Sequence, residues 1–105
     1  MISFINKLLG FGNNEQLANY IREGAILVDV RTVGEFKSGS VPGAVNIPLD
    51  KLEGQLHKLP QQSKIVVFCR SGMRSGQAKR ILENKGYTQV INGGTKAKIS
   101  KAKSK

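Results

Sequence analysis

The chain has 105 residues, of which 39% are hydrophobic, and a formal net charge of +10 at pH 7. This length suits one domain with a modest core, and the apolar content predicts a folded protein rather than a disordered one. The single cysteine, Cys69, excludes an internal disulfide, and together with the single histidine, His57, it is too little for a zinc site. We expect no metal and no other cofactor.

Residues 1–13 are expected to form an apolar extension ahead of the first helix. The stretch lacks a basic start and a small-residue cleavage site, which argues against a signal peptide, and it is too short to cross a membrane. We therefore expect no transmembrane segment, an extension that packs against the domain, and a cytoplasmic protein.

The first half of the chain predicts two helices and two strands. Asn13 or Asn14 caps a helix that runs to about residue 23. Residues 25–30 are almost continuously apolar, as in a parallel strand that is buried on both faces. Thr32 and Glu35 match a capping box, which starts a short helix, and residues 44–47 form a brief strand.

The second half repeats this alternation. Asp50 and Glu53 match the capping pattern again and open a helix that stops before Pro60. Residues 65–68 form a buried strand, residues 77–85 a helix and residues 89–91 a last short strand. Because strands alternate with helices, the predicted fold class is α/β, with a small parallel β-sheet and helices on both faces.

The domain is expected to occupy residues 14–95, followed by a lysine-rich tail at residues 96–105. The five lysines of the tail are separated by small or aliphatic residues, with no aromatic side chain on which a base could stack. We expect a solvated, frayed end, and the pattern argues against nucleic acid as a partner.

Cys69 lies between the apolar strand and a predicted helix, at the start of a small polar loop that contains two arginines. This order aims backbone N–H groups and the positive end of the helix dipole at the sulfur. Such surroundings favour ionisation of a thiol and hold an anion beside it. We therefore expect Cys69 to be a reactive nucleophile rather than an inert core thiol.

Five motifs, in this order, resemble those of the single-domain rhodanese family. They are Asp29-Val30-Arg31, Glu35-Phe36, residues 41–48, the loop that begins at Cys69, and Asn92-Gly93-Gly94. The resemblance covers residues 14–95 and implies a rhodanese-like fold and a thiosulfate sulfurtransferase whose cysteine carries a sulfane sulfur as a persulfide. Ser40 stands where many members have a histidine. Thr95 and the lysine-rich tail stand in place of an aromatic residue and a further helix.

The resemblance implies thiosulfate or another sulfane-sulfur donor as substrate, and cyanide, a small thiol or a thiol protein as acceptor. Cys69 is the expected catalytic residue. The loop after it is expected to bind substrate through forked guanidinium donors, hydroxyl groups and backbone N–H groups, and its residues are Arg70, Ser71, Gly72, Met73, Arg74 and Ser75.

Two further expectations concern the surroundings of this loop. Gly72 allows a backbone conformation that a side chain would obstruct. Asp29 and Arg31 are expected to pair with each other, with Glu35 or with backbone groups, and so to give structural support beside the site.

Two other functions stay open on the sequence. Cysteine phosphatases that resemble this fold have five residues between thiolate and arginine, whereas four separate Cys69 from Arg74. The shorter loop favours a single sulfur atom over a phosphoryl group and argues against phosphatase or arsenate chemistry. The second alternative is a persulfide relay, whose sulfur is supplied and removed by protein partners that dock on the basic tail.

Overall fold

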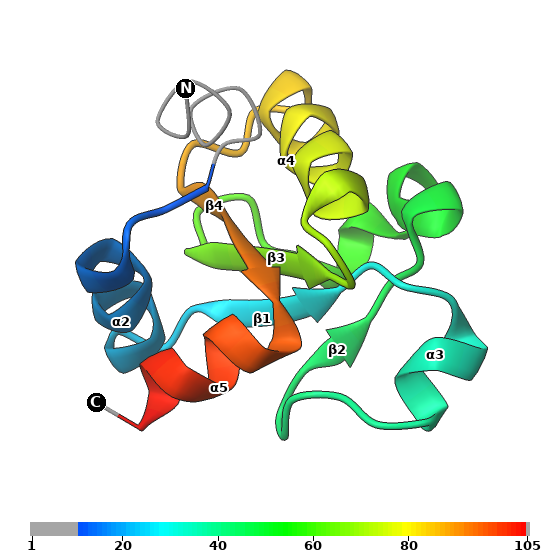
Figure 1. Ribbon diagram of the computed structural model, residues 1–105. Coiled ribbons are helices and arrows are strands. Elements are labelled where there is room, and N and C mark those ends of the chain that lie inside the picture. The colour runs from blue at the N-terminus through cyan, green and yellow to red at the C-terminus, as the bar shows by residue number, and fades with distance from the viewer. Residues whose placement is uncertain (1–10, 105) are drawn as a thin grey trace.

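A parallel four-stranded sheet with helices on both faces organises the chain (Figure 1). The computed structural model describes residues 11–104. In chain order, the elements are α2 (Asn14–Arg22), β1 (Ile26–Asp29), α3 (Val33–Lys37), β2 (Val45–Asn46), the 3-10 helix η1 (Leu49–Lys58), β3 (Ile65–Cys69), α4 (Met73–Asn84), β4 (Val90–Thr95) and α5 (Lys96–Lys103). The strand order is β2-β1-β3-β4, and the predicted α/β class is confirmed.

Strand β3 lies at the centre of the core, and all five of its residues are buried. Ile65, Val67 and Cys69 belong to the apolar cluster under α4 and η1, whereas Val66 and Phe68 belong to the cluster under α2 and α5. Side chains alternate between the two faces because a strand has a period of two residues. Cys69 therefore ends β3 on the face whose apolar cluster also contains Ala78 and Leu82 of α4.

The capping signals expected for the first two helices form. The Asn13 side chain accepts a hydrogen bond from the Gln16 N–H at 2.7 Å and caps α2. Thr32 and Glu35 form a complete capping box at the start of α3, with Thr32 Oγ1 accepting from the Glu35 N–H at 3.2 Å. The capping box fixes where α3 begins, just beyond the end of β1.

Two of the predicted helices differ from expectation. Helix α4 begins at Met73 rather than at residue 77, because the helical turn starts directly after Gly72. The segment after Pro48 is a 3-10 helix that begins at Leu49 without a side-chain cap, so the capping role expected for Asp50 is wrong. Non-helical backbone angles at Gln55 divide η1 into two pieces.

The expectation of a frayed lysine-rich end is also wrong. Strand β4 continues through Thr95, whose side chain caps α5 by accepting from the Lys98 N–H at 3.2 Å. Helix α5 then buries Ile99 completely and Ala102 almost completely, in the apolar cluster that also holds residues of α2. The further helix that Thr95 and the lysines were expected to replace is therefore present, built from lysine and small apolar residues.

Residues 1–10 of the expected N-terminal extension lie outside the described residues, so the packing expected of them stays a prediction. At the end of the extension, Phe11 makes an isolated parallel bridge with Asn92 of β4. Among residues 11–104, no helix is long and apolar enough to cross a membrane.

Candidate active site

The Cys69 thiol lies inside the loop that joins β3 to α4. Cys69 is 1% exposed, its Sγ accepts a hydrogen bond from the Gly72 N–H at 3.0 Å, and the Ser75 Oγ lies 3.4 Å away. Both contacts arise because the chain turns sharply after the strand and enters α4 at once. The loop therefore brings hydrogen-bonding groups to a thiol that otherwise belongs to the apolar cluster under α4 and η1.

These contacts set the ionisation of the thiol. Burial alone would raise the pKa of Cys69, because it removes water from the anion. The hydroxyl of Ser75 and the backbone N–H groups of Ser75, Ser71 and Gly72 outweigh burial and lower the pKa of Cys69 below its usual value. The loop thus favours the thiolate, the form of cysteine that acts as a nucleophile.

Gly72 makes the turn possible. Its φ of 95° lies in the left-handed region that residues with a side chain rarely adopt, as expected from the sequence. A Cβ atom on Gly72 would also lie 2.5 Å from Cε1 of the Phe11 ring. The loop is therefore packed from behind by the segment that precedes α2.

Arg74 is held by an ion pair with Glu35. Its two terminal nitrogens donate to the Glu35 carboxylate oxygens at 2.7 and 3.1 Å, which ties α4 to α3. The Arg74 hydrogen bonds, with help from the Thr32 N–H, lower the pKa of Glu35 to about 2. Glu35 therefore supports the guanidinium of the thiol loop, whereas the sequence had linked it to Asp29 and Arg31.

A surface depression of about 300 Å³ borders the guanidinium. It is lined by Val30, Thr32, Pro48, Leu49, Asp50 and Arg74. The depression therefore lies between the segment that follows β1, the start of η1 and the start of α4.

Asp29 and Arg31 pair as expected. Arg31 Nε and Nη2 donate to the Asp29 carboxylate at 2.7 to 3.0 Å, and Arg31 Nη2 also donates to the Gly39 carbonyl at 2.7 Å. Ser40 Oγ donates to Asp29 Oδ2 at 2.7 Å, so the residue that departs from the family pattern joins this network. Burial would raise the pKa of Asp29, but the bonds from Arg31 and Ser40 lower it overall.

Three other loop residues place their side chains at the rim of the loop. Arg70, Ser71 and Met73 are exposed, and Met73 is 57% accessible to solvent. Ser71 Oγ accepts from the Met73 N–H at 3.4 Å, near the start of α4. The structure thus brings the Gly72 N–H, the Ser75 hydroxyl and the Ser71 backbone N–H to the thiol, and it leaves the side chains of Arg70, Ser71 and Met73 at the rim.

Asn92 is a residue of the site that the sequence did not single out for a role. It is fully buried, its Nδ2 donates to the Gly72 carbonyl at 2.9 Å, and its Oδ1 accepts from Ser75 Oγ at 2.7 Å and from the Gly94 N–H at 2.9 Å. The available signal was a polar residue inside an apolar strand, beside two glycines. Its contacts join β4 to the thiol loop across the sheet, so no local pattern predicts them.

A metal site does not emerge from the described part of the chain. Within residues 11–104, no group of three or more His, Cys, Asp or Glu side chains lies where it could hold a metal ion. The chemistry that the arrangement supports is that of a thiolate surrounded by N–H and O–H donors.

Comparison with known proteins agrees with this arrangement. The model of the Rhodanese-like domain family matches residues 13–99. A sulfurtransferase of Allochromatium vinosum is 33% identical over 88 residues, which cover 84% of this chain and 80% of that protein. The thiosulfate sulfurtransferase PspE of Escherichia coli is 41% identical over 69 residues, which cover 64% of this chain and 66% of PspE.

A solved structure is similar over almost the whole fold. The human single-domain sulfurtransferase TSTD1 superposes with a TM-score of 0.75 at 28% identity, over 90% of this chain and 96% of that one. These relatives support sulfur transfer as the general activity. With the family model matching residues 13–99 and the fold shared, this chain belongs to the rhodanese-like domain family.

Proposed function

We propose that this protein is a sulfurtransferase that moves a sulfane sulfur from thiosulfate or a related donor to a thiophilic acceptor through a persulfide on Cys69. The observation that carries the proposal is the Cys69 sulfur itself. It ends the central strand, accepts the Gly72 N–H at 3.0 Å and has a pKa lowered by the Ser75 hydroxyl and the loop N–H groups, against its own burial.

The proposed reaction has two displacements at sulfur. In the first, the Cys69 thiolate attacks the outer sulfur of thiosulfate, the S–S bond of the donor breaks, and sulfite leaves with the bonding electron pair. In the second, an acceptor thiolate or cyanide attacks the outer sulfur of the persulfide, and Cys69 leaves as a thiolate. N–H groups aimed at the sulfur stabilise the thiolate that begins the first step and ends the second.

The loop side chains would hold the donor. We assign Arg74, which borders the depression of about 300 Å³, to the sulfonate oxygens, because the Glu35 pair keeps its guanidinium in a fixed orientation. Arg70, Ser71 and Met73 are exposed at the loop rim, where they would meet donor or acceptor as it arrives. Asp29 and Arg31 would support the site from beneath.

The test is the release of sulfite in a single turnover. Mixing the full chain with excess thiosulfate in the absence of an acceptor should release one sulfite per Cys69 thiolate and then stop, because the persulfide has no acceptor. Cys69→Ser should release none, and Ser63→Ala, in the turn before β3 and outside the thiol loop, should keep the burst. A wild-type protein that releases neither sulfite from thiosulfate nor the corresponding thiol from an organic persulfide would rule out the proposal.

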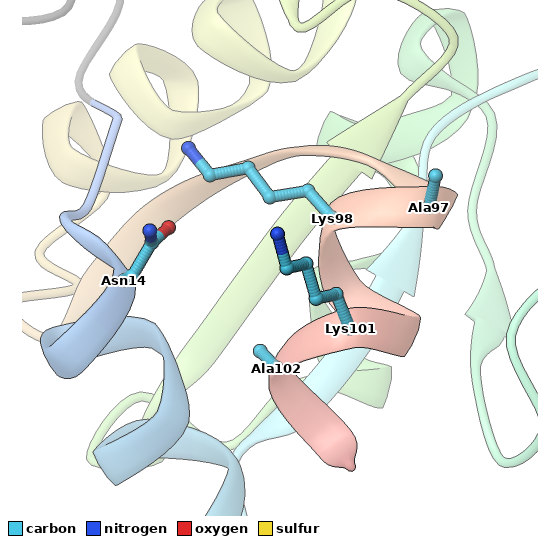
Figure 2. Close-up of a pocket in the computed structure, with 5 residues that line it drawn as sticks. All are labelled: Asn14, Ala97, Lys98, Lys101 and Ala102. Atoms are coloured by element: carbon cyan, nitrogen blue, oxygen red, sulfur yellow. The ribbon is translucent and has the colours of Figure 1, made fainter. Parts of the chain in front are cut away.

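A second candidate is a persulfide relay for an acidic protein partner. It is favoured by a groove of about 280 Å³ between α2 and α5. Figure 2 shows the side chains of Lys98 and Lys101 reaching from α5 toward this groove, with Asn14 of α2 on its far side. Lys98 Nζ lies 5.0 Å from the centre of the Phe11 ring, and Phe11 in turn packs on Gly72, so the groove adjoins the back of the thiol loop.

The structure determines how the relay should be tested. Deleting α5 would remove the buried Ile99 from the core, so the lysines are replaced instead: Lys98→Gln with Lys101→Gln. If a partner docks here, this pair should slow partner-dependent transfer and weaken its dependence on salt, while transfer to cyanide is unchanged. The matched control is Lys51→Gln with Lys58→Gln on η1, over the opposite face; equal effects of the two pairs would refute docking at α5.

A further inference from the structure

The side-chain amide of Asn92 has a fixed orientation. The Gly94 N–H is a donor, so the amide atom 2.9 Å from it must be the oxygen, and the Gly72 carbonyl is an acceptor, so the amide atom 2.9 Å from it must be the nitrogen. Two backbone groups of opposite character therefore decide which way Asn92 points. Its oxygen is the atom that faces Ser75.

This orientation decides where the hydrogen of Ser75 goes. A serine hydroxyl has one hydrogen to donate and lone pairs that accept. Because Ser75 Oγ lies 2.7 Å from Asn92 Oδ1, which can only accept, the hydrogen points at Asn92. Ser75 Oγ then turns a lone pair toward Cys69 Sγ at 3.4 Å, and the S–H of a neutral thiol is the donor across that gap.

An ionised sulfur reverses this arrangement. A thiolate has no hydrogen to donate, and the lone pair of Ser75 would face its negative charge. We propose that Asn92 is a positioning residue that competes with Cys69 for the Ser75 hydrogen, and that this hydrogen turns from Asn92 to the sulfur when Cys69 becomes an anion. Asn92 Oδ1 still accepts the hydrogen bond from the Gly94 N–H. The proton lost from Cys69 leaves the site, whereas the Ser75 proton stays on its own oxygen.

For the reaction, this means that the Ser75 hydroxyl changes its hydrogen-bond acceptor according to the charge on the Cys69 sulfur. When Cys69 is a neutral thiol, Ser75 Oγ donates to Asn92 of β4 and accepts from the S–H of Cys69. When Cys69 attacks, or when it leaves as a thiolate after the sulfur has passed on, Ser75 supplies a donor at the moment the charge appears. This inference rests on the proposed function only in taking the thiolate as the reacting form.

The charged groups near the sulfur do not replace this mechanism. On α4, Arg74 interacts electrostatically with Cys69 and is paired with Glu35 of α3. Beyond the end of β1 lies the buried pair of Asp29 and Arg31. The side chain that β4 presents to the loop is the uncharged Asn92, so all of these charges stay the same in the variants compared below.

The test is a double-mutant cycle on the titration of Cys69, followed in the full chain by the ultraviolet absorbance of its thiolate, with Cys69→Ala as the blank. Ser75→Ala should reduce the thiolate fraction at neutral pH about tenfold, since a hydrogen bond to a charged sulfur is lost. Asn92→Ala should increase that fraction several-fold when Ser75 is present, because the competitor is gone. In the Ser75→Ala background the increase should vanish.

A purely structural role of Asn92 predicts a different result. It would change the thiolate fraction by the same factor with and without the Ser75 hydroxyl, and that outcome overturns the proposal. Asn46→Ala removes another amide that binds backbone carbonyls, those of Asp29 and Arg31, and is the control expected to behave additively. No sulfur donor is present, so the result is independent of whether thiosulfate is a substrate.

A second measurement needs no substitution at Asn92. In nuclear magnetic resonance spectra of the wild-type chain, the Asn92 side-chain amide and the Gly94 N–H should shift with the titration of Cys69, because both sense the loss of the Ser75 hydrogen. Ser75→Ala should abolish most of that shift. Signals that move equally in both proteins would contradict the turning hydroxyl even if Asn92→Ala failed to fold.

Discussion

At the scale of single residues, the site is supported by charges and amides that are buried beside it. Asp29 is fully buried and receives hydrogen bonds from the Arg31 guanidinium, the Arg31 N–H and the Ser40 hydroxyl. Arg31 also donates a hydrogen bond to the Gly39 carbonyl, so one network joins the end of β1 to the turn before β2. A buried pair of this kind costs most when one partner alone is removed.

Asp29→Asn should therefore lower the free energy of unfolding by about 3 kcal/mol at neutral pH, because Arg31 would keep a buried charge without its counter-ion. Urea denaturation measures the change. Glu53→Gln, which removes an exposed partner 3.7 Å from Lys85, should cost less than about 1 kcal/mol and is the control. Equal losses in the two variants would show that the buried pair contributes no more than a surface pair.

The same carboxyl gives a pH dependence. The pKa of Asp29 is lower in the folded protein than its usual value of 3.8, because the bonds from Arg31 and Ser40 outweigh burial. Its stabilising contribution is thus fully present above pH 3.8 and is lost as pH falls through the lower, folded value. The difference in unfolding free energy between wild type and Asp29→Asn should accordingly shrink only in strong acid; a difference that already shrinks near pH 6 would contradict this assignment.

At the scale of elements, α5 is a structural helix rather than a charged tail. Ile99 is fully buried in the apolar cluster under α2, while Lys96 and Lys103 donate to the carbonyls of Gly39 and Pro42 at 3.3 and 2.9 Å. The helix therefore covers one face of the sheet and also holds the turn that leads into β2. The lysines of α5, which led to the expectation of a solvated tail, lie on the outside of a packed helix.

Ile99→Ala should consequently destabilise the fold by about 3 kcal/mol, because it leaves a cavity between α5 and the sheet. Lys101→Ala, an exposed position on the same helix, should change stability by less than about 0.5 kcal/mol. Thermal or urea unfolding compares the two. If Ile99→Ala were as mild as Lys101→Ala, the segment would have to be frayed in solution after all.

The elements also show which parts of the fold could be predicted from the sequence. The capping box at Thr32 and the cap at Asn13 were predictable because their partners lie three residues away. Helix α5 could not be predicted in this way, because the burial of Ile99 and Ala102 depends on contacts with residues that are distant in the sequence. At the site, Cys69 and the conformation of Gly72 followed from a strand, a turn and a helix in succession, whereas Asn92 is joined to Ser75 across 17 residues of sequence.

At the scale of the whole molecule, the parallel sheet places the reacting sulfur where separate elements converge. The residues of the site come from four elements: Cys69 from β3, Ser75 and Arg74 from α4, Glu35 from α3 and Asn92 from β4. Each is an element end or the start of a helix at the same edge of the sheet, except for Asn92, which braces the loop from within β4. The chain as a whole carries a net charge of +10, which would favour the approach of an anionic donor such as the thiosulfate proposed above.

The most direct test of the account is the intact mass of the protein after exposure to thiosulfate and removal of small molecules. The account predicts a gain of one sulfur atom per chain, located on the peptide that contains Cys69, absent from Cys69→Ala and removed by cyanide with formation of thiocyanate. An unchanged mass of the folded wild-type chain after treatment with thiosulfate and with other sulfane donors would contradict the persulfide on which the proposed function depends.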